Sequence, residues 1–152
     1  MKKLMLLVLL GLFMTSCSTD DGVPNIEYGL APITDYDLPE FFEAGKSYDL
    51  KLTYQLPSTC HTFYGFDGGR EDESSQEIFV YAITSKNLEA ANCDTEDPNL
   101  TKEGTIRNFM VSANVSEDEV FTFKLWTGKD EDGNPIFTDV EIPVGDPAVE
   151  QP

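Results

Sequence analysis

The chain of 152 residues is strongly acidic, with 28 Asp and Glu against 10 Lys and Arg and a formal net charge of −18. Such a charge repels phosphates and therefore argues against nucleic acid, or the bare surface of an anionic membrane, as a partner. The length allows one domain with a hydrophobic core of its own.

The first sixteen residues have the three parts of a secretory signal peptide: two lysines, an apolar run over residues 4–13, and small residues after it. A helix of that apolar run covers about 15 Å, which is half of the roughly 30 Å hydrocarbon core of a bilayer. We therefore expect residues 1–16 to be a signal peptide and not a transmembrane helix.

The signal ends in Met-Thr-Ser-Cys at residues 14–17, which resembles the lipobox of bacterial lipoproteins. Met14 departs from the pattern, in which leucine is commoner at this position. The resemblance implies that the Cys17 thiol carries a diacylglyceryl group and that the chain is cut just before it. Several acyl chains, at about 0.8 kcal/mol per buried CH₂, attach a protein durably to a membrane. The mature chain would carry 8 basic and 28 acidic residues, a net charge of −20.

Residues 17–30 are expected to be the acylated N-terminus and a flexible tether, because Asp, Gly, Pro and Asn are mixed there without a period. The run Ser-Thr-Asp-Asp after Cys17 resembles the surface-export signal of lipoproteins in certain glycan-foraging and gliding Gram-negative bacteria. That resemblance implies a surface-exposed protein on the bacterial outer membrane. The alternative is that the run has no role beyond the tether.

Seven short segments with β-strand character follow, separated by turn residues. The clearest is 47–55, where Tyr48, Leu50, Leu52 and Tyr54 alternate with polar residues, as in a strand with one face on the core. Segment 76–85 is apolar almost without interruption. A long loop is expected over 86–103, and residues 146–152 are expected to be a tail. The other predicted strands span 31–38, 60–66, 105–115, 119–127 and 136–144.

This pattern predicts an all-β domain over residues 31–145, a single antiparallel β-sandwich of about seven strands like those of immunoglobulin and fibronectin-III domains. A small up-and-down barrel would bury the same faces and is the alternative. The immunoglobulin disulfide joins the two sheets through strands B and F, whereas here Cys60 opens the third predicted strand and Cys93 lies in a loop.

Without Cys17, the chain retains two cysteines, Cys60 and Cys93, an even pair for an oxidising compartment. We predict a disulfide between them, worth roughly 3–4 kcal/mol in the chain-entropy model. A zinc site is disfavoured because His61 is the single histidine. A Cys60–His61 nucleophile pair is disfavoured because neighbouring residues on a strand point to opposite faces.

Residues 130–134, Asp-Glu-Asp-Gly-Asn, resemble the start of a calcium loop, with Asp130 and Asp132 as candidate metal ligands. The twelve-residue pattern fails because strand-like residues follow, although Glu141 falls at its closing position. The favoured alternative is a hairpin turn in which Asp-Gly supplies a positive φ. The acidic segment 67–73 has the same two interpretations, a cation site or a solvated loop. No cofactor is expected.

Aromatic residues are the better indication of binding, since the chain has 10 Phe, 6 Tyr and 1 Trp. Tyr64 lies between Phe63 and Phe66, so rings occupy both faces of that strand. Trp126 is out of phase with the apolar alternation before it, which predicts a position on the outer face or rim. Tyr64 and Trp126 are therefore candidate ligand contacts that would stack on sugar rings. The alternative is that such rings cover the edge of the core.

The sequence contains no G-x-S-x-G, P-loop, dinucleotide or H-E-x-x-H motif. The strands between residues 48 and 144 resemble those of small secreted lipoproteins of the bacteria named above, a resemblance that carries no activity. We expect a non-catalytic binding or assembly module of the cell envelope, with a polysaccharide or an envelope protein as partner. The alternatives are a structural accessory subunit of an outer-membrane complex and a glycoside hydrolase that uses paired carboxylates.

Overall fold

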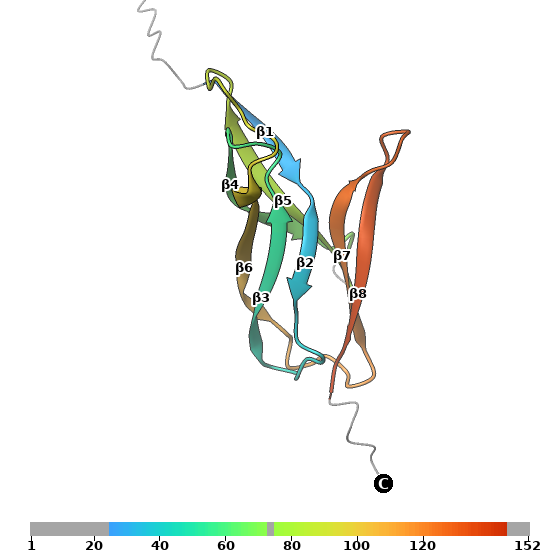
Figure 1. Cartoon of the computed structure of the whole chain (residues 1–152). Helices are drawn as coiled ribbons and strands as arrows, with labels where there is room; N and C mark the ends of the chain where they lie inside the picture. Colours follow the sequence, from blue (N-terminus) through green and yellow to red (C-terminus); the bar gives the residue numbers. More distant parts are fainter. Residues whose placement is uncertain (1–24, 73–74, 146–152) are drawn as a thin grey trace, which may run out of the picture.

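The computed structural model describes residues 25–72 and 75–145 of the chain. The predicted signal peptide, the acylation site Cys17, the acidic run after it and the tail at 146–152 lie outside the described residues. The described part is all-β, as predicted, and its strands form two sheets (Figure 1).

The described residues form eight strands and one turn of 3₁₀ helix. They are β1 (Ile26–Ala31), β2 (Ile33–Asp37), β3 (Ser47–Gln55), β4 (His61–Gly69), β5 (Glu77–Asn87), η2 (Pro98–Leu100), β6 (Thr101–Met110), β7 (Val120–Lys129) and β8 (Pro135–Pro143).

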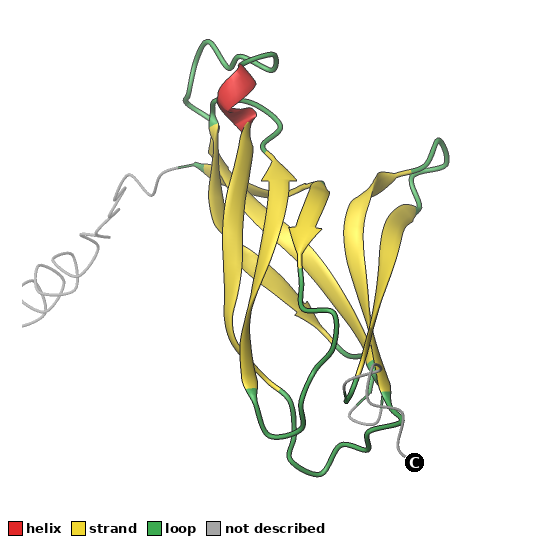
Figure 2. Cartoon of the chain, turned by 60° about the horizontal axis from the view of Figure 1, so that its bottom comes forward, coloured by secondary structure: helices red, strands yellow, loops and turns green. Residues whose placement is uncertain are grey.

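The two sheets pack against each other, with loops at both ends (Figure 2). One sheet has the order β2-β3-β6, and the other joins β1, β4, β5, β7 and β8. The core cluster takes residues from both sheets, among them Leu50 and Leu52 from β3 and Phe123 from β7. The alternation predicted for residues 47–55 is confirmed, because Leu50, Leu52 and Tyr54 are buried along β3.

The first strand begins earlier than predicted, at Ile26 instead of residue 31. The chain forms β1, changes sheet at Pro32, and continues as β2, so that β1 pairs with β5 and β2 pairs with β3. Proline lacks an N–H and suits such a break between ladders. The tether assignment of residues 26–30 is therefore wrong, since these residues form a strand by pairing with β5.

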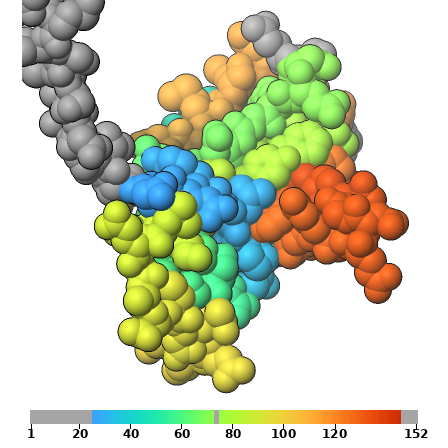
Figure 3. Space-filling view, turned by 90° about the horizontal axis from the view of Figure 1, so that it is seen from above, coloured from blue at the N-terminus to red at the C-terminus, as the bar shows by residue number. Residues whose placement is uncertain are grey.

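The five-stranded sheet is mixed, not purely antiparallel, because β5 and β7 are parallel. One edge of β5 serves two partners: Glu77–Val80 pair with β7, and residues 82–87 pair with β1. Beyond Leu125, β7 therefore has only β8 beside it. The β7–β8 hairpin diverges from its neighbours toward its tip (Figure 1) and projects from the side of the molecule (Figure 3, orange to red).

Strand β6 ends at Met110, before the predicted end at residue 115, and it contains a bulge. Asn108 has a φ of 56°, and its N–H donates to Asp49 Oδ1 at 3.0 Å. Since β3 pairs Tyr48 with Phe109 but Leu50 with Ile106, one extra residue is accommodated on β6. The bulge lets Ile106 and Phe109, three positions apart, both pack on the core.

Phe42 anchors one end of the core, although it lies in a loop. Its backbone joins β8 through Phe42 N–H to Pro143 C=O at 2.8 Å, and its own carbonyl accepts from Gly145 N–H at 2.7 Å. The ring is fully buried and contacts four others, those of Tyr48, Phe109, Phe121 and Phe123.

Candidate binding surface

Strand β5 is apolar on both faces, which explains its almost continuous apolar sequence. Val80, Ala82 and Thr84 point into the core and are buried. Phe79 and Tyr81 alternate with them and lie on the outer side of the five-stranded sheet, where they are only half-buried. An apolar row on an outer face is unusual, because the outer face of a sandwich strand is ordinarily polar.

A third ring joins this outer row from β8. The centroid of Phe137 lies 5.3 Å from that of Phe79 and 5.8 Å from that of Tyr81, both in edge-to-face contacts. Such pairs contribute about 0.5–1.5 kcal/mol each beyond their buried area. We call Phe79, Tyr81 and Phe137 the aromatic face. The contacts hold the three rings in fixed relative positions, so the surface is preformed.

The neighbouring strand β4 leaves these rings uncovered. Gly69 stands opposite Phe79 in the β4–β5 register, Asp67 stands opposite Tyr81, and Gly65 stands opposite Ile83. A Cβ added at Gly65 or Gly69 would meet no atom within 4 Å, so no packing constraint within the described residues demands glycine there. The effect of both glycines is to remove side chains that would otherwise shield the outer row.

An open pocket of about 400 Å³ lies where β4 ends beside the aromatic face. Two of the rings, two acidic residues and one arginine are among the residues that line it. Its lining is about equally polar and apolar, so it offers both ring surfaces and hydrogen-bonding groups. The lining residues are Asp67, Gly68, Gly69, Arg70, Glu71, Phe79 and Tyr81.

Tyr64, a predicted ligand contact, is 69% exposed and lies in the bulge of β4. Its ring packs edge-on against Tyr28, with centroids 5.3 Å apart, and Tyr28 is 60% exposed. Sequence reasoning missed Tyr28 because it falls within residues 17–30, the predicted N-terminus and tether. The only local signal for it would have been the alternation of Ile26, Tyr28 and Leu30.

Trp126, the other predicted contact, is 7% exposed, so its ring presents almost no surface to a ligand. It is paired with Phe137, next to a bulge between Trp126 and Gly128 on β7. The pairing puts Trp126 on the same side of the sheet as Phe137, the predicted outer side, but its ring is buried there and not open to a ligand. Trp126 is not part of the core cluster between the two sheets, so the alternative, in which the ring covers the edge of the core, is not confirmed.

Asp130 and Asp132, the predicted metal ligands, lie in the β7–β8 turn. The Asp130 carboxylate accepts hydrogen bonds from the Asp132 N–H at 3.0 Å, the Asn134 N–H at 2.7 Å and the Asn134 side-chain amide at 3.0 Å. The Asn134 side chain contributes most to lowering the pKa of Asp130. Gly133 has a φ of 86°. The favoured hairpin-turn interpretation accounts for these residues without a cation.

No group of three or more His, Cys, Asp or Glu side chains in the described part of the chain could hold a metal ion. This includes the described portion of the acidic segment, residues 67–72. There, the Asp67 carboxylate accepts from the N–H of Gly68 at 2.8 Å.

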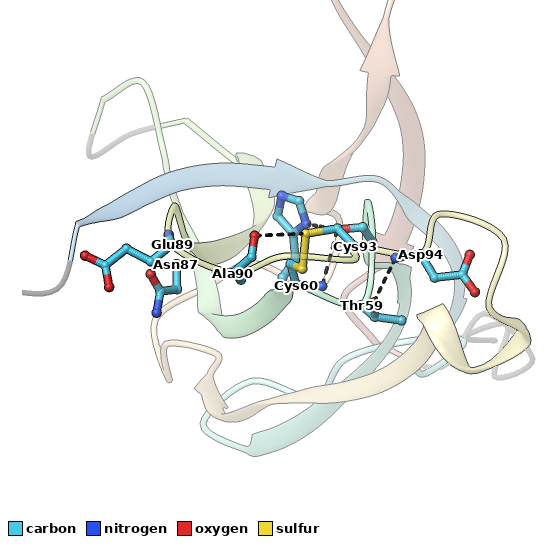
Figure 4. Close-up of a disulfide and its surroundings, with 9 residues drawn as sticks. Thr59, Cys60, Asn87, Glu89, Ala90, Cys93 and Asp94 are labelled. Atoms are coloured by element: carbon cyan, nitrogen blue, oxygen red, sulfur yellow. Dashed lines mark hydrogen bonds between the residues drawn. A yellow bond between two sulfur atoms is a disulfide. The ribbon is translucent and has the colours of Figure 1, made fainter.

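The predicted disulfide between Cys60 and Cys93 is present, with Cα atoms 5.1 Å apart (Figure 4). It ties the loop after β5 to the start of β4. Thr59 and Asp94 form a second tie beside it, because Thr59 N–H donates to Asp94 C=O at 2.8 Å and Asp94 N–H donates to Thr59 Oγ1 at 3.0 Å. These contacts fix a loop that has no regular structure between Leu88 and Asp97.

Ser58 and His61 form a hydrogen-bonded pair that sequence reasoning did not identify, with Ser58 Oγ 2.8 Å from His61 Nδ1. Partial burial, and secondarily the charge of Lys86, lower the pKa of His61 below its ordinary value. Ser58 is buried, and its hydroxyl also accepts from the Cys60 N–H at 3.3 Å. The pair therefore closes the turn before β4, and a buried hydroxyl is poorly placed to attack a substrate.

Comparison of the chain with models of protein families, with curated proteins and with solved structures finds no match. Within the residues that the structure describes, no helix has the length and apolar character needed to cross a bilayer.

Proposed function

We propose that this chain is a non-catalytic, lipid-anchored surface protein whose β-sandwich binds an uncharged polysaccharide. The observation that carries the proposal is the aromatic face, three half-buried rings on the outer side of a sheet whose inner side already fills the core. Contiguous apolar surface of this kind commonly marks an interaction site.

The chemistry of the face suits a sugar. A pyranose ring has an apolar side of C–H groups, which stacks on an aromatic ring, and a rim of hydroxyl groups. The carboxylates of Asp67 and Glu71 at the edge of the pocket can accept hydrogen bonds from such hydroxyls. The strong negative charge of the chain disfavours anionic polymers. A neutral polysaccharide is therefore the ligand class that these groups fit.

Two features support a location outside the cytoplasm. An acylated Cys17, which the lipobox-like residues before it imply, would anchor the chain, and the acidic residues Asp20 and Asp21 would direct it to the outer surface of the outer membrane. A disulfide between Cys60 and Cys93 suits an oxidising compartment, because cytosolic thiols are kept reduced.

An immunoglobulin-like architecture is part of the same proposal. Two packed sheets and a first strand divided between them at Pro32 support it. The disulfide departs from the immunoglobulin pattern, since it joins a loop to the start of β4.

The binding proposal is tested with the full chain purified in mild detergent. Affinity electrophoresis through soluble β-glucan, xylan and mannan should retard the protein in at least one of them. Tyr81→Ala should abolish that retardation, whereas Tyr36→Ala should not, because Tyr36 is an exposed tyrosine on β2 in the other sheet. No retardation in any polymer, or equal retardation of the two variants, would contradict the proposal and favour the accessory-subunit alternative.

The location is tested by adding protease to intact cells, with a periplasmic protein as the protected control. Loss of the domain is expected. If the domain is protected to the same extent as the control, it lies on the periplasmic side of the outer membrane, and the export role of Asp20 and Asp21 is contradicted.

A further inference from the structure

A second pair of rings lies on the same side of the sheet as the aromatic face. Tyr28 stands opposite Ser85 in the β1–β5 register, and Ser85 follows Tyr81 by four positions on β5. Side chains at even spacing along a strand share a face. Tyr28 therefore lies on the outer side of the sheet, and Tyr64 lies there with it because their rings are in contact.

The tyrosine pair, Tyr28 and Tyr64, spans β5 from either side. Tyr28 comes from β1 and Tyr64 from β4, and between them β5 contributes only the small side chain of Ser85. The two rings make few other contacts, since each remains more than half exposed. Two large rings held together and open to solvent form a contact surface for another apolar face.

The two aromatic positions are too far apart for one sugar. Ser85 follows Tyr81 by four residues and Phe79 by six, which corresponds to roughly 13 Å and roughly 20 Å along the strand. Between them the row contains Ile83, half-buried, with Gly65 and Leu30 as its partners on either side. No charged side chain interrupts this outer row between Tyr81 and Ser85.

We propose that the outer face of β5 binds an extended, linear, uncharged oligosaccharide of several units, with one end on the aromatic face and the other on the tyrosine pair. This inference rests on the proposed function and specifies its ligand as an extended chain and not a single sugar or a chain end. The acids at the pocket rim and the net charge of the chain exclude an acidic polymer as the preferred occupant.

The test is isothermal titration of the full chain in detergent with disaccharides and hexasaccharides of glucan, xylan and mannan backbones. For the type of glycan that binds, the hexasaccharide should bind at least tenfold more tightly than the disaccharide. Tyr28→Ala/Tyr64→Ala should remove that advantage, a loss of about tenfold that corresponds to one stacking contact, and should leave disaccharide binding unchanged. Circular dichroism checks that this variant is folded, which is expected because both rings are exposed.

Two further variants separate the possible failures. Tyr81→Ala should weaken the binding of both the disaccharide and the hexasaccharide, and Tyr36→Ala should weaken the binding of neither. Equal affinity for the two lengths, or an unchanged length dependence in the double variant, would overturn the extended site and leave the proposed function standing. No binding of any of these oligosaccharides, or binding of chitosan oligosaccharides alone, would overturn both.

Discussion

Thr84 lies in the middle of β5 with its side chain fully buried, and no described residue hydrogen-bonds to its hydroxyl oxygen. A buried hydroxyl without a partner opposes folding, because its hydration is lost and not replaced. Thr84→Val, which replaces the hydroxyl with a methyl group, should raise the free energy of unfolding by about 1 kcal/mol. Urea unfolding measures this change.

The matched control is Thr127→Val on β7. The Thr127 hydroxyl donates to the carbonyl oxygen of Ile136 at 3.3 Å, so its removal should give no gain in stability. A Thr84→Val protein that is no more stable than wild type would show that the hydroxyl is satisfied in solution.

His61 should make the protein less stable in mild acid. Burial, followed by the charge of Lys86, lowers its pKa in the folded state, so the fold favours the neutral ring. The contribution is fully present above the unfolded pKa of about 6.5 and is lost as the pH falls through the folded value. Between pH 7.5 and pH 5 the free energy of unfolding should therefore fall more in the wild type than in His61→Gln. The carboxylates titrate in both proteins, so the difference between them reports on His61. Parallel pH profiles would refute this.

The β7–β8 hairpin depends on a few large side chains at its base. Beyond Leu125 it is a two-stranded ribbon, which is marginally stable alone. Trp126 is buried there, and its replacement by alanine should cost about 3–5 kcal/mol. Amide hydrogen exchange should accelerate throughout residues 126–138. Ile136→Ala, an exposed site in the same hairpin, is the control and should change exchange little.

The disulfide between Cys60 and Cys93 holds the loop after β5 in place and should contribute to the stability of the fold. A closed loop with a sequence separation of 33 stabilises the fold by roughly 3–4 kcal/mol through the unfolded state. Cys60→Ala/Cys93→Ala should lose about that amount in urea unfolding at equilibrium. Dithiothreitol should destabilise the wild type and leave this variant unaffected. If reduction leaves the wild-type midpoint unchanged, the bond contributes no net stability.

Strand positions were predictable wherever the information was local. The alternation of β3 and the apolar run of β5 fixed those strands to within two residues at each end. Strand β1 was not predicted, because the alternation of Ile26, Tyr28 and Leu30 is short and its partner strand, at residues 82–87, lies far away in sequence. The parallel β5–β7 pairing was not predicted for the same reason: the sequence of neither strand indicates which distant strand it pairs with.

The candidate site was predicted in part. Tyr64 was identified because Phe63, Tyr64 and Phe66 place rings on both faces of one strand, and the structure finds it exposed. The aromatic face was missed, because a continuous apolar strand equally predicts burial on both sides. Which side remains open is decided by Gly65 and Gly69 on a different strand, and that depends on register.

At the scale of the whole molecule, the dominant feature is unbalanced charge. The sequence has 28 acids and 10 bases, and among the described residues the lysines that form ion pairs are Lys51 and Lys124. Like charges repel most strongly in the compact state. Raising sodium chloride from 10 mM, where the Debye length is about 30 Å, to 500 mM should therefore raise the urea midpoint. A constant or falling midpoint would show that local pairs outweigh the net charge.

Strand β1 also has a mechanical consequence. In a chain held to a membrane through Cys17, tension enters the domain at Ile26, which is paired with Asn87 at the far end of β5. A polymer bound at Phe79 and Tyr81, as proposed, would pull on the other half of β5. Forces that act along the strand axis in opposite directions at these two places would shear the β1–β5 ladder and load its six residue pairs together, instead of separating them one at a time. Under the proposed anchoring and binding, tension would pass from β1 to β5 through this ladder, and part of it would also reach the three-stranded sheet, because β1 continues as β2.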